Sequence, residues 1–520
     1  MTGNGWDLIV VGAGSAGAAL AVRSAEKGKR VLLLEAGPDY RSAQMHEAWR
    51  SPNPAIALTD PTAAEGMLWL GLDSTRTEAQ QPGPYWRGRG VGGSSSVNGQ
   101  IAIRPPMEDF ADWSALGCAG WSADDVLPYF ARLEDDEAFG HEPHHGRGGP
   151  TPIHRAPQEH WGGVDTALFL SARGAGFEWA PDVNAPGATG VSPYPINSRG
   201  GRRVSVNDAY LERARELDHL TIRGDTLVDR VLFEGDRATG VRVLTGGTAV
   251  TEYADTVVLS AGVIHTPTIL MRSGIGPAGH LSSLGVEVRQ DLPVGQGMQD
   301  HPMAILSLPL TPAATSKSPH DRHTNVCVRW TSGAGAPVND LMFVAMNQNV
   351  LSMATADTGV GAGAYGVWLN QAHSRGELTL VSTDPARQPR VRQRMLSDER
   401  DLDRMRGGMR ALVELARRPE TEAITAGSLE QENEMLFAVL DDDRKLDDHL
   451  LATAGDAQHG TSTCRMGHPD AADTVVDPGC RVLGVEGLRV VDASIFPSVP
   501  RANTNLATIM AGELMADRLD

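Results

Sequence analysis

The glycine-rich start of the chain restricts its fold more than any other stretch. Residues 8–11 form a short apolar run, as a buried parallel strand requires, and Gly12, Gly14 and Gly17 follow it with GxGxxG spacing. The first glycine permits a tight turn, the second lets the backbone approach a pyrophosphate, and the third lets helix and strand pack closely. This pattern predicts the first strand and turn of a dinucleotide-binding unit.

The residues after the glycines complete the unit. The range 15–27 predicts a helix, and its first residues, Ser15 and Ala16, would present N–H groups to a phosphate. A second apolar strand is expected over 31–34, and Glu35 ends it, eighteen residues after Gly17. A carboxylate at this distance suits a ribose hydroxyl pair and would repel a 2′-phosphate, which argues against NADP. NAD and FAD both remain open.

Composition excludes several classes of partner. The 520 residues suffice for two domains, and 58 glycines indicate many tight turns and close backbone approaches. A formal charge of −19 argues against nucleic acid and against anionic membrane surfaces. The N-terminal residues lack a basic secretory n-region, and no apolar run reaches the ~20 residues of a transmembrane segment. With only four cysteines, we expect a soluble, reduced, cytoplasmic enzyme.

A second glycine-rich stretch, residues 86–99, reads WRGRGVGGSSSVNG. Its glycines and serines disfavour both a helix and a central strand. Such a segment is either a flexible surface loop or a cradle that offers N–H groups and hydroxyls to a polar molecule. Composition alone favours the flexible loop.

This stretch resembles the first signature of the glucose–methanol–choline (GMC) oxidoreductases, and residues 260–276 resemble the second. In that family the loop covers the pyrophosphate and isoalloxazine of FAD, so the resemblance implies FAD as the cofactor. Some members link FAD covalently through a histidine where this chain has Val97, which implies non-covalent FAD. The resemblance gives cofactor contacts to residues that lie far apart in the chain: Gly92, Gly93, Ser94, Asn98, Val228, Asp492, Ala493 and Asn505.

The chemistry is expected near the C-terminus. On the resemblance, His459 holds the catalytic histidine position, and Asn503, eleven residues after Asp492, holds the second active-site position. Alcohol oxidation removes a hydroxyl proton and an α-hydride, and histidine is the side chain that supplies a base without a large pKa perturbation. An amide can hydrogen-bond the substrate oxygen, so His459 would be the base. Ser462 departs from the family pattern, which has glycine there.

The predicted function is FAD-dependent oxidation of a primary alcohol to the carbonyl, with the hydride passing to flavin N5 and the electrons to O2, a quinone or another acceptor. A hydroxynitrile lyase on the same fold is the alternative, in which FAD is bound without net redox chemistry. A non-catalytic flavoprotein is disfavoured by His459 and Asn503, and a simple NAD dehydrogenase leaves both C-terminal motifs unexplained. The alcohol, the electron acceptor and the oligomeric state stay open.

The predicted fold class is α/β, or α+β overall. A Rossmann-like FAD-binding domain is expected over 1–151, 194–302 and 456–520, and a discontinuous substrate domain, an antiparallel sheet flanked by helices, over 152–193 and 303–455. Two further motifs receive structural interpretations. The sequence Asp300-His301-Pro302 fits the family pattern, and the histidines at 141, 144 and 145 are expected in a solvated loop with no metal.

Overall fold

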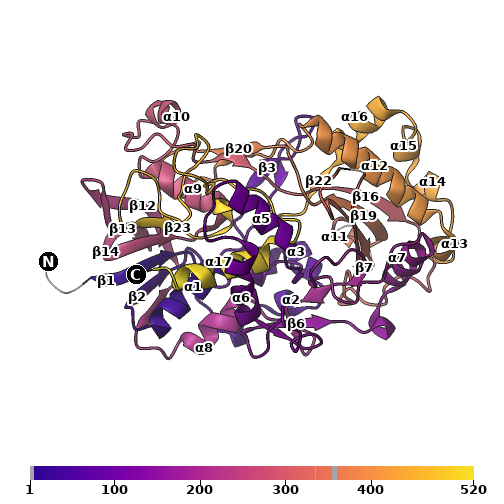
Figure 1. Ribbon diagram of the computed structural model, residues 1–520, viewed down its shortest axis with the longest axis horizontal. Coiled ribbons are helices and arrows are strands. Elements are labelled where there is room, and N and C mark those ends of the chain that lie inside the picture. The colour runs from indigo at the N-terminus through magenta and orange to yellow at the C-terminus, as the bar shows by residue number, and fades with distance from the viewer. Residues whose placement is uncertain (1–4, 334, 354–359, 520) are drawn as a thin grey trace.

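A computed structural model describes residues 5–333, 335–353 and 360–519. Residues 1–4, which form part of the segment from which we predict no secretory leader, lie outside these ranges. Figure 1 shows two lobes side by side, with β1 and β2 in the left lobe and helix α12 over the sheet of the right lobe. Within the described ranges, no helix is long and apolar enough to cross a membrane.

The left lobe is built on a seven-stranded sheet with the order β11-β2-β1-β14-β13-β12, and β23 also pairs with β14. Its parallel part consists of β1 (Trp6–Val11), β2 (Val31–Leu34), β11 (Leu220–Arg223), β23 (Leu488–Val490) and the C-terminal end of β14 (Thr248–Leu259). The strands β12 (Thr226–Glu234) and β13 (Arg237–Thr245) continue it in antiparallel fashion. Segments more than 450 residues apart therefore share one sheet, as a Rossmann-like fold requires.

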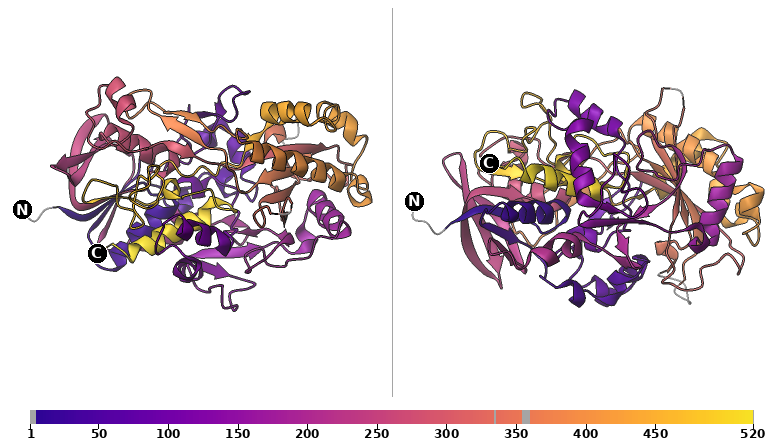
Figure 2. Two further views of the ribbon diagram at one scale, coloured as in Figure 1. Left: turned by 45° about the horizontal axis from the view of Figure 1, so that its top comes forward. Right: turned by 60° about the horizontal axis from the view of Figure 1, so that its bottom comes forward.

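Helix α1 (Ser15–Glu26) connects β1 to β2, as the sequence predicts. Its Gly17 lies so close to the turn that an added Cβ would collide with the carbonyl oxygen of Gly12. On its other side, α1 packs on α17 (Thr504–Ala516), where Gly512 allows equally close contact with the Ala16 backbone. Figure 2 shows these two helices, indigo and yellow, side by side. The third glycine of the motif thus serves helix–strand packing.

The right lobe contains a six-stranded antiparallel sheet in the order β22-β16-β19-β18-β17-β7. The strands are β22 (Gly455–Asp456), β16 (Pro302–Leu308), β19 (Gly363–Leu369), β18 (Leu341–Met346), β17 (Val326–Trp330) and β7 (Gly190–Pro193). Helices α7 (Gly163–Gly174) and α12 (Glu399–Ala416) pack on one face. Methionine and leucine residues at helical spacing predict α12, and its buried residues lie on that stripe.

Successive side chains of each strand point to opposite sides, so this sheet has two different faces. In β18, Leu341, Phe343 and Ala345 belong to the core beneath α7 and α12, whereas Met342 and Val344 belong to a separate small cluster with Ile101 and Tyr194. The second face therefore turns away from the helices. Together with the left lobe it encloses the site described below.

Two local expectations need correction. Residues 38–83 are rich in Pro, Ala, Thr and acids, which predicts loops and short helices rather than a sheet. The short helices are present, but the region also supplies β3 (Asp73–Thr75), which pairs with β4 (Gly83–Pro84) and β21 (Arg390–Arg392). A strand of three residues is too short to show a periodicity in the sequence, and one of its two partners, β21, lies more than 300 residues away.

The histidine-rich loop is the second correction, because His145 is buried and not solvated. Its Nδ1 lies 2.7 Å from Glu134 Oε1 and its Nε2 lies 2.8 Å from Asp182 Oδ2. Arg104 and Arg155 pair with the same carboxylates. These acceptors raise the pKa of His145 to about 9 against the opposing effect of burial. Three cations thus face the carboxylates of Glu134, Asp136 and Asp182, which is a balanced ion-pair network.

We predict that His145→Gln destabilises the protein in a pH-dependent way. Because the folded-state pKa is raised, the contribution of His145 is complete below pH ~6.5 and is lost as the pH rises through about 9. Removing one partner from a buried network costs about 3–5 kcal/mol. The free energy of unfolding of the variant should therefore be lower than that of the wild type at pH 6 and close to it at pH 9.5.

The measurement is urea denaturation of the holoenzyme at both pH values. His154→Gln is the matched control, since His154 pairs with Glu137 at 2.7 Å but its side chain is 39% exposed. The control should lose less than about 1 kcal/mol. An equal loss for His145→Gln at pH 6 and pH 9.5 would contradict the ionic role.

Candidate active site

One cavity of about 450 Å³ lies where the two lobes meet. It is lined by nearly every residue that the sequence assigns to cofactor or chemistry. These lining residues are Gly12, Gly14, Ser15, Ala16, Glu35, Gly93, Ser94, Asn98, Val228, His459, Asp492, Ala493, Asn503 and Asn505. Gly17 and Gly92 are the two assigned residues that do not line it. Gly17 lies at the helix–strand contact described above, and Gly92 has φ +89° at the start of the loop turn.

The two glycine-rich segments meet at one point of the cavity wall. A Cβ added at Gly93 would lie 2.8 Å from the Cα of Gly14, and the N–H of Gly92 donates to the carbonyl of Ala13 at 2.8 Å. Side chains would force the two backbones apart. The close approach places backbone without side chains at the cavity wall, which is a feature of dinucleotide sites.

Glu35 connects these segments to each other. Its Oε2 accepts a hydrogen bond from the N–H of Ala13, and its Oε1 accepts from the N–H groups of Gly37 and Gly90, all at 2.9–3.0 Å. Burial raises the pKa of this carboxyl group. Glu35 therefore has a structural function in addition to the ribose contact that the sequence predicts, because it holds three loops in place.

Two helices begin at the cavity without side-chain caps. Helix α1 starts after Gly14 and α17 after Asn503, and neither has an acidic residue in its first turn. The uncapped N–H groups and the helix dipoles favour electronegative atoms at both positions. Ser15 Oγ donates to Asn505 Oδ1 at 2.8 Å, while the Nδ2 of Asn505 is buried without a partner among the described residues. These unpaired donors fit a large, oxygen-rich cofactor.

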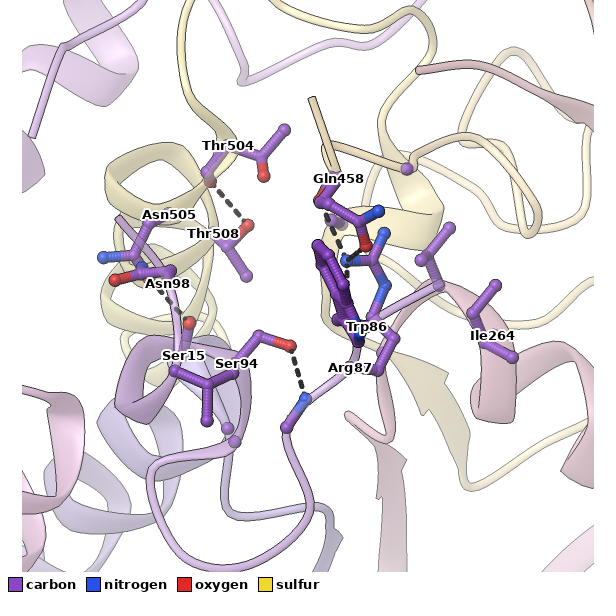
Figure 3. Close-up of a pocket in the computed structure, with 18 of the residues that line it drawn as sticks. Ser15, Trp86, Arg87, Ser94, Asn98, Ile264, Gln458, Thr504, Asn505 and Thr508 are labelled. Carbon is purple, nitrogen blue, oxygen red and sulfur yellow. Dashed lines mark hydrogen bonds between the residues drawn. The ribbon is translucent and has the colours of Figure 1, made fainter. Parts of the chain in front are cut away.

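Other assigned residues are held by hydrogen bonds around the same cavity. Ser94 Oγ accepts from the N–H of Gly88, and Asn98 Oδ1 accepts from Arg203 at 2.8 Å. Asp492 accepts from the N–H groups of Gly262 and Ser494. Figure 3 shows Ser15, Ser94, Asn98, Asn505 and Thr508 on one side of an open space and Trp86, Arg87, Gln458 and Ile264 on the other. The space between them has the form of a slot.

A chain of hydrogen bonds determines the proton positions at His459. The Nε2 of His301 lies 2.9 Å from the carbonyl oxygen of Pro500, so this nitrogen must carry the proton. In the neutral ring His301 Nδ1 is then an acceptor, and His459 Nδ1, 2.9 Å away, must donate to it. His459 Nε2 is thus unprotonated, and it accepts from Asn503 Nδ2 at 3.0 Å.

Electrostatics keep both histidines neutral. Burial lowers the pKa of His301 to about 4. Burial, with smaller effects from His301 and Arg87, holds the pKa of His459 well below its ordinary value. The pKa of Asp300 changes in the opposite direction, because burial and the nearby Asp456 raise it to about 7. His459 is consequently present as a free base at neutral pH, with its lone pair beside the amide of Asn503.

The backbone around His459 is strained on both sides. Gln458 has φ +62° and Ser462 has φ +71°, in the left-handed region that favours glycine. Ser462 thus adopts a glycine-like conformation at the position where the GMC pattern has glycine. Asp300 Oδ1 accepts from the N–H groups of His459 and His301 at 2.8 and 2.7 Å, which helps to hold this turn.

Sequence reasoning missed His301, which it interpreted as structural. The signal was the Asp300-His301-Pro302 motif itself, because an acid–histidine pair that fits a family pattern can belong to a site. What the sequence could not supply was the distance of 2.9 Å between residues 158 positions apart.

Comparisons with known proteins agree with this geometry. Two GMC oxidoreductase family models match residues 6–303 and 372–512. The chain is 35% identical to a 5-(hydroxymethyl)furfural oxidase of Methylovorus sp. (strain MP688), covering 100% of this chain and 99% of the relative. It is 34% identical to the mitochondrial choline dehydrogenase of Homo sapiens, covering 98% and 89%.

Solved structures show the same fold. Pyridoxine 4-oxidase from Mesorbium loti superposes with a TM-score of 0.87 at 28% identity, covering 99% of each chain. A fungal aryl-alcohol oxidase superposes with a TM-score of 0.80 at 21% identity over 99% of each chain, and this likeness concerns the fold alone. The cavity and its histidine chain, the two family models and these relatives lead to one conclusion: the protein belongs to the GMC oxidoreductases, FAD-dependent enzymes that act on CH–OH donors.

Proposed function

We propose that this enzyme oxidises a primary alcohol to the carbonyl compound with His459 as the base. The observation that carries the proposal is the hydrogen-bond order Pro500–His301–His459–Asn503, which leaves an unprotonated Nε2 in the cavity. An alcohol hydroxyl that takes the place of the Asn503 amide at that nitrogen can give up its proton to it, while the amide donates to the alcohol oxygen instead. The Asn503 amide then stabilises the charge that develops on the substrate oxygen.

The cavity residues fit non-covalently bound FAD. Glu35 would contact the ribose, the N-terminus of α1 the pyrophosphate, and Asn98, Asn505 and the start of α17 the flavin. When bound, FAD supplies a hydride acceptor at N5 and a path for the electrons to O2, a quinone or another acceptor. Val97 lines the cavity at the position where some family members attach the flavin through histidine, and valine offers no nucleophile for such a bond.

The acidic residues of the cavity argue against a cationic substrate such as choline. The described lining of the cavity contains three acidic residues, Glu35, Asp456 and Asp492. Each of the three carboxylates already has a hydrogen-bond or ion-pair partner within the protein. Glu35 and Asp492 accept from backbone N–H groups, and Asp456 pairs with Arg76 at 2.7 Å. No free carboxylate of the described lining remains to balance an ammonium group. This favours an alcohol of the type that the furfural oxidase name describes.

The hydroxynitrile lyase alternative is separated by one observation. Anaerobic addition of an alcohol bleaches the flavin of an oxidising enzyme, whereas a lyase cycle leaves the flavin oxidised.

Two further expectations stay predictions. These are the domain boundaries at residues 151, 193, 302 and 455 and the cytoplasmic location.

The first prediction concerns the attachment of the cofactor. Because Val97 cannot form a flavin linkage, acid or heat precipitation should release intact FAD into the supernatant. Absorbance of the supernatant and of the pellet measures the partition. Flavin that stays with the precipitated polypeptide would contradict non-covalent binding.

The second prediction separates the functions of His459 and Asn503. His459→Ala should slow anaerobic flavin reduction by at least the ~10²–10⁴-fold that general-base loss costs. Asn503→Ala should lose one hydrogen bond to a partly charged oxygen, worth roughly 1.5–3 kcal/mol, or about ten- to more than a hundredfold. Stopped-flow absorbance measures both rates after FAD content has been matched. A wild-type rate for His459→Ala would refute the assignment.

The third prediction concerns pH. The pKa of His459 lies well below 6.5, so the neutral base persists as the pH falls through 6.5, whereas Asp300 titrates at about 7. An inflection of the flavin-reduction rate near pH 7 should therefore disappear in Asp300→Asn. The test is stopped-flow reduction from pH 5 to 9. An inflection at pH ~6.5 that persists in Asp300→Asn would show that His459 titrates at its ordinary pKa.

A further inference from the structure

The cavity continues beyond His459 along the second face of the antiparallel sheet. At one end, the ring of Trp368 in β19 lies 5.7 Å from the ring of His459, centroid to centroid, in an edge-to-face arrangement. Trp368 is paired across the sheet with Met342 of β18. Val344 and Met346 follow on the same side of β18, and both line the cavity. This face is apolar throughout its middle.

His323 lies at the other end of this apolar wall. Its carbonyl oxygen accepts from the N–H of Asn347, the residue directly after β18. A strand rises about 3.4 Å per residue, so the four steps along β18 from Met342 to Met346 separate the His459 end of the cavity from the His323 end by ~14 Å. His323 and its neighbour Thr324 both line the cavity. A substrate whose CH2OH group is at His459 can therefore extend an apolar body toward His323.

The far end of the cavity is polar, and none of the acidic residues of the described lining lies next to His323 or Thr324 in the chain. The Oγ1 of Thr324 and the Nδ1 of His323 are buried without partners among the described residues. Arg322 precedes them in the chain, and among the described residues its guanidinium donates to two carbonyl oxygens, those of Pro52 and Gly99, at 3.3 and 3.4 Å. Both contacts are long for charge-assisted hydrogen bonds. Burial lowers the pKa of Arg322 to about 10, which still leaves it charged at neutral pH.

A second cation lies on the same side. Arg203 is buried and binds Asn98 Oδ1 and the carbonyl oxygens of Ser95 and Trp49. Neither Arg203 nor Arg322 has a carboxylate within 4.0 Å among the described residues; the acids that act on them from farther away are Asp208 and Asp165. Asp165 already accepts from the side chain of Asn325. Both arginines donate to residues of the cavity wall, Arg203 to Asn98 and Arg322 to the carbonyl oxygen of Gly99. Their charges add to the effect of burial, which lowers the pKa of His323 to about 3.

We infer that the His323 end of the cavity binds an anionic group, so that the substrate is an elongated alcohol with a carboxylate at the end remote from its CH2OH group. This rests on the proposed function. The acidic cavity residues are already paired, and the two unpaired guanidinium charges stabilise an anion beside His323 and Thr324. The apolar β18 wall holds the body of the substrate between the two ends.

The test uses the FAD-loaded enzyme and matched alcohols of two lengths. These are 4-(hydroxymethyl)benzoate and 3-[4-(hydroxymethyl)phenyl]propanoate, each compared with its carboxamide. For at least one length, kcat/KM of the carboxylate should exceed that of the carboxamide by tenfold or more. Binding is measured separately with the unreactive ligands 4-methylbenzoate and 4-methylbenzamide, through the change that each causes in the flavin absorbance.

Single substitutions test which residues cause the preference for the carboxylate. Arg322→Met and His323→Leu should each reduce the carboxylate preference at least fivefold, in both kcat/KM and ligand binding, whereas Arg322→Lys should retain most of it. Arg329→Met is the matched control, because Arg329 is also buried and, among the described residues, donates to carbonyl oxygens, those of Val183 and Ala188. Unlike Arg322, whose neighbour His323 lines the cavity, Arg329 has no cavity-lining residue beside it in the chain. This control should leave the preference unchanged.

Two failures are distinguishable. If no alcohol bleaches the flavin anaerobically, the proposed alcohol oxidation is wrong. If the alcohols bleach it but carboxylate and carboxamide react equally at both lengths, the anionic subsite alone is wrong. A preference that survives in both Arg322→Met and His323→Leu would likewise overturn the subsite.

Discussion

The structure depends on a buried carboxylate that holds two glycine-rich loops together. Glu35 lies at the end of β2 and accepts hydrogen bonds from the N–H groups of Ala13, Gly37 and Gly90. Burying a carboxylate is costly unless it is hydrogen-bonded, and three backbone donors offset that cost. The loops in turn set the cavity wall, because Gly14 and Gly93 meet there without side chains. The cavity wall formed by these two loops therefore depends on Glu35.

The reacting end obeys a second constraint, which is the direction of its hydrogen bonds. One backbone carbonyl, that of Pro500, fixes the tautomer of His301, and His301 then fixes that of His459. The ring of His459 is therefore oriented without a carboxylate partner, and Asp300 binds the backbone N–H of His459 instead. As the proposed base, this neutral imidazole takes a proton from the alcohol that binds at Nε2, which couples proton transfer to substrate binding.

Much of this was accessible from sequence. The strands at 6–11 and 31–34, helix α1, helix α12 and the FAD-type glycine loop all have local signals, because periodicity and glycine spacing are properties of neighbouring residues. The short strand β3 and the ion pairs of His145 have none. A three-residue strand and a histidine in a Gly- and Pro-containing loop look like solvated chain until their distant partners are placed beside them.

The sequence by itself determined the nucleotide-binding unit and the family resemblance, and it led to His459 and Asn503 as the proposed catalytic residues, since each rests on residue type at fixed spacing. Only the tertiary structure decided which proton His459 carries, because that depends on His301 and Pro500, which come from distant parts of the chain. It likewise decided that Glu35 ties three loops together and that Arg322, next to the cavity residue His323, has no carboxylate within 4.0 Å among the described residues. Hydrogen-bond direction and charge balance are relations between groups in space, and a linear pattern does not encode them.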